Sequence, residues 1–445
     1  MKTLLKRAKG SALDIITGRH APPGTITLLS PRAREIEHLN FPPNLWSEIL
    51  TFSQVVSGSL PLLRTLRIHV AKSPLDQLNE LTPPSLPLFS GAINLKEFYH
   101  DSELAGTLNH FVFPNLTTFK LSVQKMDRTE ASHLFDFLKA SPTLRTFAVT
   151  IDGGTVPGST SQDTAVVLPN VEKFSLLVRD NRWQVYEPVV HISCPRAKHT
   201  LLAQEICDDD MAIGLELFPN SALWKAINNQ YTTIPVEEVT LKIEDDFSVV
   251  AYSLDFRSSD ATVISLGFEV TRALGFAVEP LLLTSERMTL EIFSQACRTI
   301  RDLPLLSHLK GLHIEGNAGA LDLNCVDVVG DLFRSLGPLD ELTIDGFDIH
   351  IFLAPYIDLP EFQHFQRVFP SVKELTITER ADDEERCPGA IVELAKSQHE
   401  LGKPFERVTF HANWLPAALA ERLRQWVSVA DCHELPDISP EEVWL

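Results

Sequence analysis

FPNLTTFKLSV, at residues 113–123, decides the fold because nearly the same phrase returns along the chain. It recurs as SPTLRTFAVTI at 141–151, LPNVEKFSLLV at 168–178 and FPSVKELTIT at 369–378. Each copy has a proline, a spacer, an aliphatic residue, two mostly polar residues, a large apolar residue, one further residue and another apolar residue. Self-similarity of this kind is the signature of a repeat architecture, so the repeat is the first feature to explain.

Further copies extend the repeat over most of the chain. They are SLPLLRTLRIHV, INLKEFYHD, IPVEEVTLKI, TVISLGFEV, HLKGLHIEG, GPLDELTIDG and KPFERVTFH. The first apolar anchors of all the copies are Leu63, Leu95, Leu116, Leu144, Val171, Val236, Val263, Leu309, Leu339, Val372 and Phe405. The long gap from Val171 to Val236 contains a degenerate copy at 194–205, and an early copy lies at 35–41.

Each copy predicts a strand followed by a crossover. The last two anchors alternate with polar residues, which places them on one face of a strand. Proline cannot donate to a sheet ladder, so its place ahead of the first anchor indicates the strand entrance. Helical spacing of apolar residues predicts helices between strands, over 128–141, 285–300, 322–336, 387–400 and 415–429. Strand-helix-strand units of this kind give parallel neighbours.

A single unit of this size buries too little apolar surface to fold alone, so neighbouring units must stack on each other. We therefore expect an α/β solenoid of about 12–13 irregular repeats, with a curved parallel sheet on its inner face and helices and loops outside. The predicted organisation is an N-terminal capping segment at 1–34, repeats over 35–415 with a degenerate or inserted region at 179–235, and a C-terminal capping helix and tail at 416–445.

Composition restricts the classes of partner. The 445 residues carry a formal net charge of −20, which disfavours nucleic acids and anionic membrane surfaces. The six cysteines are scattered without a CxxC pair, which indicates packing in a reducing compartment. The first residues lack the apolar run of a secretory signal, and no stretch of about 20 apolar residues occurs. We expect a cytoplasmic or nuclear location, with neither a nucleic acid nor a membrane as partner.

The repeat core resembles that of leucine-rich repeat proteins, since LxxLxL is legible in LLRTLRI, LTTFKL, LDELTI and VKELTI. Long units with an outer helix resemble ribonuclease-inhibitor-like repeats, and the irregular Pro-x-Leu style looks most like fungal, basidiomycete-type F-box-associated leucine-rich repeat proteins. The resemblance covers about residues 10–415. It implies noncovalent recognition of a protein, as in the substrate receptors of Skp-cullin-F-box ubiquitin ligases.

The chain departs from that family at two points. The asparagine that follows LxxLxL in the family is mostly absent, so the turn backbone must be satisfied in another way. FPPNLWSEILTF, at 41–52, is similar to the opening of an F-box, but a repeat strand follows at Leu63. The alternative interpretation of this segment is the outer helix of the first repeat. A Skp-type adaptor is an expected partner only if an F-box exists.

Motifs of nucleotide, zinc and serine-hydrolase chemistry (GxGxxG, GxxxxGK[ST], HExxH and GxSxG) do not occur. The Gly- and Ser-rich stretch at 153–163 is interpreted as a loop, and the acidic runs at 208–210 and 382–385 as solvated loop charges. We therefore expect no catalysis, cofactor or metal. Two alternatives stay open: a scaffold unrelated to ubiquitin, and an enzyme with its site in an insertion within 179–235.

The inner face is the candidate binding surface, because polar residues between the anchors point away from the core. The candidate residues are Arg67, His69, Tyr99, Lys120, Lys173, Lys242, His313, Glu315, Glu341, Asp345, Glu374 and Arg407. The early strands carry Arg67, Lys120 and Lys173, and the later ones carry Glu315, Glu341, Asp345 and Glu374. The predicted surface therefore changes from basic to acidic and would orient an unidentified protein partner. The alternative is a set of ordinary strand residues in water.

Overall fold

A computed structural model gives the fold. It describes residues 12–16, 30–44, 46–56, 60–70, 87–126, 128–152, 166–179, 192–207, 236–245, 249–259, 262–271, 293–294, 296–298, 300–301, 308–316, 325–346, 350–357, 364–378, 387–412, 415–416 and 418–434. The chain divides into two compact units. The first comprises Met1–Glu205 with Ser221–Gln230, and the second comprises Ile206–Asn220 with Tyr231–Leu445.

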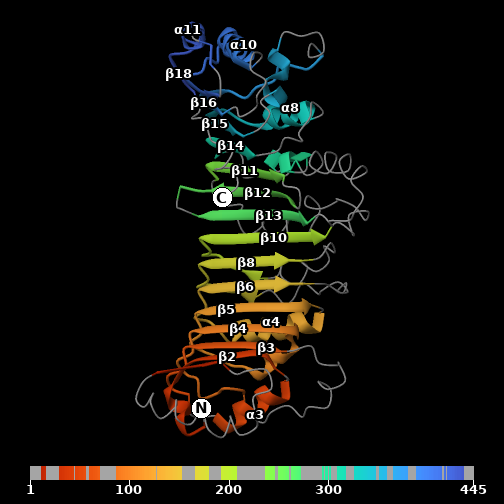
Figure 1. Ribbon diagram of the computed structural model, residues 1–445, viewed down its shortest axis with the longest axis vertical. Coiled ribbons are helices and arrows are strands. Elements are labelled where there is room, and N and C mark those ends of the chain that lie inside the picture. Colours follow the sequence, from red (N-terminus) through yellow and green to blue (C-terminus); the bar gives the residue numbers. More distant parts are fainter. Residues whose placement is uncertain are drawn as a thin grey trace. The chain divides into compact units, whose positions relative to one another are not determined.

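The first unit is built on a parallel sheet with the strand order β1-β2-β3-β4-β5-β6-β8-β10 (Figure 1). All of its strand pairs are parallel. A separate two-stranded parallel sheet is formed by β7 and β9. The strands are β1 (Leu13–Ile16), β2 (Ile36–Asn44), β3 (Thr65–Val70), β4 (Glu97–Leu104), β5 (Thr118–Lys125), β6 (Thr146–Ile151), β7 (Val166–Val167), β8 (Lys173–Val178), β9 (Ile192–Ser193) and β10 (His199–Cys207).

Helices cover the buried face of this sheet. They are the 3-10 helices η1 (Ser30–Glu35) and η3 (Ala105–His110), and the α-helices α3 (Trp46–Val56) and α4 (Arg128–Lys139). The helix predicted over 128–141 is confirmed as α4, whose Phe137 ring lies 4.6 Å from that of Phe119 in β5. The segment FPPNLWSEILTF spans the end of β2 and the first part of α3, consistent with an outer helix of the first repeat.

The second unit has the strand order β13-β12-β11-β14-β15-β16-β17-β18. From β11 to β18 the neighbours are parallel. The strands are β11 (Glu238–Asp245), β12 (Val249–Arg257), β13 (Val263–Thr271), β14 (Gly311–Gly316), β15 (Leu339–Asp345), β16 (Val372–Thr378), β17 (Arg407–Ala412) and β18 (Val429–Glu434). The helices are α8 (Cys325–Ser335), α9 (His350–Leu353), η8 (Ala354–Tyr356), α10 (Cys387–Glu400) and α11 (Leu419–Leu423).

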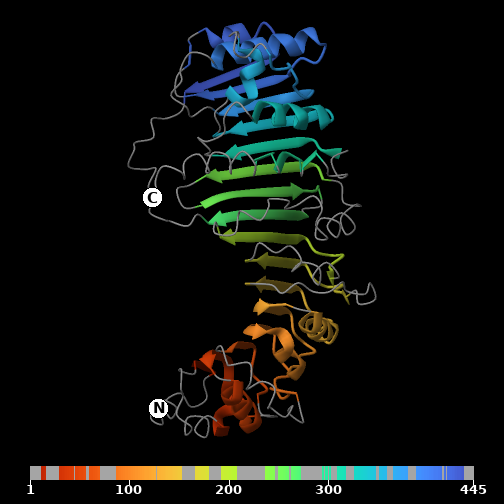
Figure 2. The same cartoon turned by 90° about the vertical axis from the view of Figure 1, so that its right-hand side faces the viewer.

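The expectation that every repeat strand is parallel to its neighbours is wrong at β12. This strand is antiparallel to both β11 and β13, and its arrow is reversed between theirs in Figure 2. A parallel crossover needs a dozen or more residues. Only residues 246–248 join β11 to β12, and only residues 258–262 join β12 to β13. Connections this short can join only antiparallel strands. The repeat anchored at Val263 is therefore β13, the last strand of an antiparallel meander.

The predicted end of the chain also differs from the observed one. The helix expected over 415–429 is confined to α11, and β18 follows it as a further parallel strand beside β17. The helices predicted over 322–336 and 387–400 are confirmed as α8 and α10. The helix predicted over 285–300 lies largely outside the described residues, as do the loop at 153–163 and the two acidic runs.

The core of the first unit contains a ladder of phenylalanines at the second anchor of successive repeats. Phe98, Phe119, Phe147 and Phe174 are paired in register on β4, β5, β6 and β8. Their rings stack with centroids 5.6, 5.7 and 5.7 Å apart. Aromatic pairs at such separations add to the stability gained from area burial. The same position in the second unit holds Leu312, Leu342, Leu375 and Val408, all buried.

A ladder of side-chain hydrogen bonds fixes the turns at the strand entrances of the first unit. Asn94, Asn115, Thr143 and Asn170 each stand directly before the first anchor of a repeat. The three asparagines donate to carbonyls one repeat earlier, at Pro61, Ile93 and Pro142 respectively, over 2.7–2.9 Å. The Thr143 hydroxyl lies 2.8 Å from the Leu116 carbonyl oxygen and 3.1 Å from that of Pro114. This ladder stabilises the turns that precede the strands, which are different turns from those that follow LxxLxL.

The confirmed fold class is therefore α/β, with mostly parallel sheets in both units. Among the described cysteines, Cys194, Cys297 and Cys325 are buried, and burial raises the pKa of the Cys194 thiol to about 12. A thiol held in this protonated form is a weak nucleophile, in agreement with the interpretation of these cysteines as packing residues.

Candidate functional site

The candidate residues lie on the open face of the sheets, defined as the face whose side chains alternate with the buried anchors. In β3, for example, Leu66, Ile68 and Val70 are buried while Arg67 and His69 are not. The same alternation continues in both units, and all twelve predicted residues are exposed or half-buried. Period-two patterning thus placed each of them on the expected side of its strand.

Three of the predicted residues come together around one aromatic ring. Tyr99 in β4 is in register with Arg67 in β3 and with Lys120 in β5. Arg67 Cζ lies 4.5 Å from the centroid of the Tyr99 ring, and Lys120 Nζ lies 5.3 Å from it. Both distances are within the range of a cation–π interaction. We call Arg67, Tyr99 and Lys120 the Tyr99 cluster.

The phenol of Tyr99 is held by a neighbouring carboxylate. Its hydroxyl donates to Glu97 Oε2 over 3.3 Å, and the hydroxyl of Thr65 donates to the same oxygen over 3.4 Å. Partial burial and the charge of Glu97 raise the pKa of Tyr99. The phenol therefore stays neutral, and the ring is held between its two cationic neighbours and Glu97.

His69 lies beside this cluster and pairs with a residue that the sequence analysis did not select. Its Nδ1 is 2.6 Å from Asp101 Oδ2, and the two residues are in register on β3 and β4. Asp101 follows Tyr99 by two residues, so strict alternation along β4 would have placed it on the same face. The pair completes a polar border on one side of the Tyr99 cluster.

On the next strands, the open-face residues in the same row as Lys120 carry no charge. In register with Lys120 stand Ala148, Ser175 and Leu201, on β6, β8 and β10. Leu201 is 43% exposed although it is a large apolar residue. Lys173 lies in a different row, between Thr146 and His199, and the structure does not bring it to the Tyr99 cluster. Tyrosine and arginine are both enriched among the residues that dominate binding energy at protein interfaces.

In the second unit, internal ion pairs compensate part of the predicted acidic surface. Lys242 Nζ is 2.8 Å from Glu315 Oε2, and this contact raises the pKa of Lys242. Arg407 lies 4.0 Å from carboxylate oxygens of Glu374 and of Asp431.

Three further predicted residues lie on this face in separate rows. Glu341 is in register with Glu374, His313 with Thr343, and Asp345 with Glu315. The expected change from basic to acidic surface is therefore reduced, because Glu315 and Glu374 have cationic partners.

The charged and aromatic side chains on the open face are suited to noncovalent contacts. No group of three or more histidine, cysteine, aspartate or glutamate side chains suited to a metal ion occurs among the described residues. In the same part of the chain, no helix is long and apolar enough to cross a membrane. Comparison with known proteins finds neither a matching protein-family model nor a similar curated protein.

Proposed function

We propose that this chain is a leucine-rich repeat solenoid that recognises another protein noncovalently through the open face of its first unit. The Tyr99 cluster is the observation that carries the proposal. Tyrosine and arginine are enriched among residues that dominate binding energy, and here they are positioned on a regular sheet before any partner arrives. The recurring LxxLxL pattern, the mostly parallel strands and the burial of every first anchor except Val263 support the solenoid.

A charge-reversal experiment tests the recognition surface. The Arg67→Glu/Lys120→Glu variant and the wild-type chain are used for affinity capture with quantitative mass spectrometry. A Lys310→Glu/Lys373→Glu variant makes the same change in net charge in the second unit and serves as the control. We expect some proteins to be retained by the wild type and the control but lost by the Tyr99-cluster variant. Unchanged capture by that variant would remove these residues from the proposed site.

We also propose a relationship to the substrate receptors of Skp-cullin-F-box ubiquitin ligases, with a cytoplasmic or nuclear location. The support is the resemblance of the repeats and of residues 41–52 to that family. Co-purification with a Skp-type adaptor separates this proposal from an interaction scaffold unrelated to ubiquitin. Stoichiometric binding would support a ligase receptor, whereas absence of binding with intact partner capture would favour the scaffold.

The enzyme alternative concerns the insertion at 179–235, of which only residues 179 and 192–207 are described. Within that described part, the side chain of Cys194 and the anchor position Leu202 are buried. Nothing there favours an enzyme over the recognition surface, so recognition is the function we put forward.

A further inference from the structure

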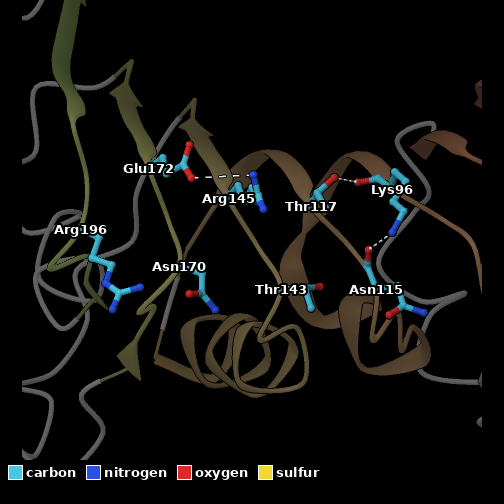
Figure 3. A pocket seen from close by; sticks show the side chains of 8 residues that line it. All are labelled: Lys96, Asn115, Thr117, Thr143, Arg145, Asn170, Glu172 and Arg196. Carbon is cyan, nitrogen blue, oxygen red and sulfur yellow. Dashed lines mark hydrogen bonds and ion pairs between the residues drawn. The ribbon is translucent and has the colours of Figure 1, made fainter.

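A groove runs along the strand-entrance edge of the first unit, beside the turns that precede β4, β5, β6, β8 and β10. It encloses about 500 Å³ and is lined entirely by polar side chains (Figure 3). Two rows of residues form it. One row, including Lys96 and Arg145, stands directly after the first anchor of each repeat, and the other, including Asn115, Asn170 and Arg196, stands directly before it.

The groove is locally cationic in a chain whose formal net charge is −20. Its cations are Lys96, Arg145 and Arg196, and its one carboxylate is Glu172. Glu172 Oε1 lies 3.9 Å from Arg145 Nη1, while Lys96 Nζ donates to the Asn115 carbonyl over 3.4 Å. Among the described residues, no carboxylate lies within ion-pair distance of Lys96 or Arg196.

The spacing of the cations indicates which backbone conformation of a bound peptide would match them. Lys96, Arg145 and Arg196 precede β4, β6 and β10, which are every second strand in the order β4-β5-β6-β8-β10. Neighbouring strands are about 4.8 Å apart, so cations on every second strand recur at about 9.6 Å across the sheet, with Arg196 in the row before the first anchors and Lys96 and Arg145 in the row after them. A polyproline II helix rises about 3.1 Å per residue with three residues per turn, so its side chains return to one face every ~9.3 Å.

The groove also offers partners to such a backbone. Asn115 and Asn170 each use their amide nitrogen to donate to a carbonyl of the preceding repeat, over 2.9 Å in both cases. That bond fixes the amide of each asparagine, and both side chains line the groove, so their oxygens are the acceptors it offers (Figure 3). A polyproline II segment makes no internal hydrogen bonds, so its N–H groups are available to such acceptors.

We propose that this groove binds an extended acidic segment of a partner protein, with a carboxylate at every third residue. Lys96, Arg145 and Arg196 pair with three successive carboxylates, and Asn115 and Asn170 accept from the peptide backbone between them. This surface uses none of the residues of the Tyr99 cluster. It is a second contact region, and its test does not depend on the function proposed above.

Fluorescence anisotropy with two labelled peptides tests the proposal on the full chain. One peptide repeats Asp-Ala-Pro four times. The other is an isomer of the same composition with its aspartates at every second position. The Lys96→Gln/Arg145→Gln/Arg196→Gln variant removes the cations, and Lys310→Gln/Lys373→Gln/Lys403→Gln makes the same charge change in the second unit. Circular dichroism checks that each variant is folded.

We expect the wild type and the control variant to bind the period-three peptide more tightly than its isomer, with affinity that falls as salt rises. Each cation removed should weaken binding about two- to fivefold, and the triple groove variant should lose roughly tenfold or more. Equal affinity for the two peptides, or unchanged binding by the groove variant, would overturn the proposal. Tighter binding of a twelve-nucleotide oligothymidine that depends on the same cations would overturn it in favour of a nucleic acid.

Discussion

The guanidinium of Arg67 lies over the ring of Tyr99, with 4.5 Å between Arg67 Cζ and the ring centroid, although the two residues belong to different repeats. A double-mutant cycle with Arg67→Ala and Tyr99→Ala should give a coupling energy of roughly 0.5–1 kcal/mol, the value expected of a solvent-exposed cation–π pair. Urea unfolding midpoints measure it. The Tyr99→Phe variant should keep most of the coupling because the ring face is retained, and purely additive effects of the two alanine changes would contradict the contact.

The asparagine ladder makes a separate prediction for turn stability. Asn94→Ala removes the donor to the Pro61 carbonyl, 2.7 Å away, and should lower the free energy of unfolding by about 0.5–1.5 kcal/mol. Asn94→Thr should cost less, because Thr143 fills the equivalent position with a hydroxyl 3.1 Å from the Pro114 carbonyl oxygen. Chemical denaturation of the three proteins gives the comparison, and equal stability of all three would show that the ladder contributes nothing.

His100 predicts a pH dependence of stability. It occupies an anchor position filled by Ile68 in β3 and by Leu121 in β5, and its Nε2 lies 2.7 Å from Thr107 Oγ1. Burial lowers the pKa of His100 to about 3. Between that pKa and the ordinary value near 6.5, the unfolded chain binds a proton that the folded chain does not. The contribution of His100 to stability should therefore fall as the pH falls through this window, by about 1.4 kcal/mol per pH unit at most.

A matched variant isolates that contribution. His100→Leu/Thr107→Val replaces both members of the buried pair by apolar residues, so neither of the two is left facing a lost partner. Its unfolding free energy should depend less on pH between about 4 and 6.5 than that of the wild type. Parallel pH profiles for the two proteins would assign the acid sensitivity to other groups.

Gly346 and Gly402 provide a prediction with an internal control. Both have positive φ, at 78° and 73°. A Cβ at Gly346 would collide with the carbonyl oxygen of Gly316, whereas a Cβ at Gly402 would meet no atom within 4 Å. Gly402→Ala should cost about 1–2 kcal/mol from backbone strain alone. Gly346→Ala adds a steric clash to that strain and should cost more, as thermal unfolding would show; the reverse order would contradict the close approach of these turns.

The sequence predicted the parts of the fold that depend on local pattern. Alternating anchors, entrance prolines and helical spacing identified α4, α8 and α10 and most of the parallel strands, because each signal lies within one repeat. The grouping of Arg67, Tyr99 and Lys120 could also have been predicted from the sequence. Each residue directly follows the second anchor of its repeat, so alignment of the repeats would have brought the three together.

Other features depend on contacts that no local pattern contains. β12 has neither an entrance proline nor an LxxLxL core, so the meander could be inferred only from its short connections. The ion pair between Lys242 and Glu315 requires β11 to lie next to β14, with β12 and β13 on the other side of β11. This ion pair was not predicted from the sequence, because no local pattern shows that β11 and β14 are neighbours.

The reversed direction of β12 restricts how the chain can change in length. Where strands are parallel, one complete repeat can be inserted or deleted and every later strand keeps its direction and its open face. Within the meander, the loss of one strand would make the remaining chain enter the sheet from the opposite edge. Insertions and deletions are therefore tolerated as single units in the parallel regions, and between β11 and β13 they must occur in pairs of strands.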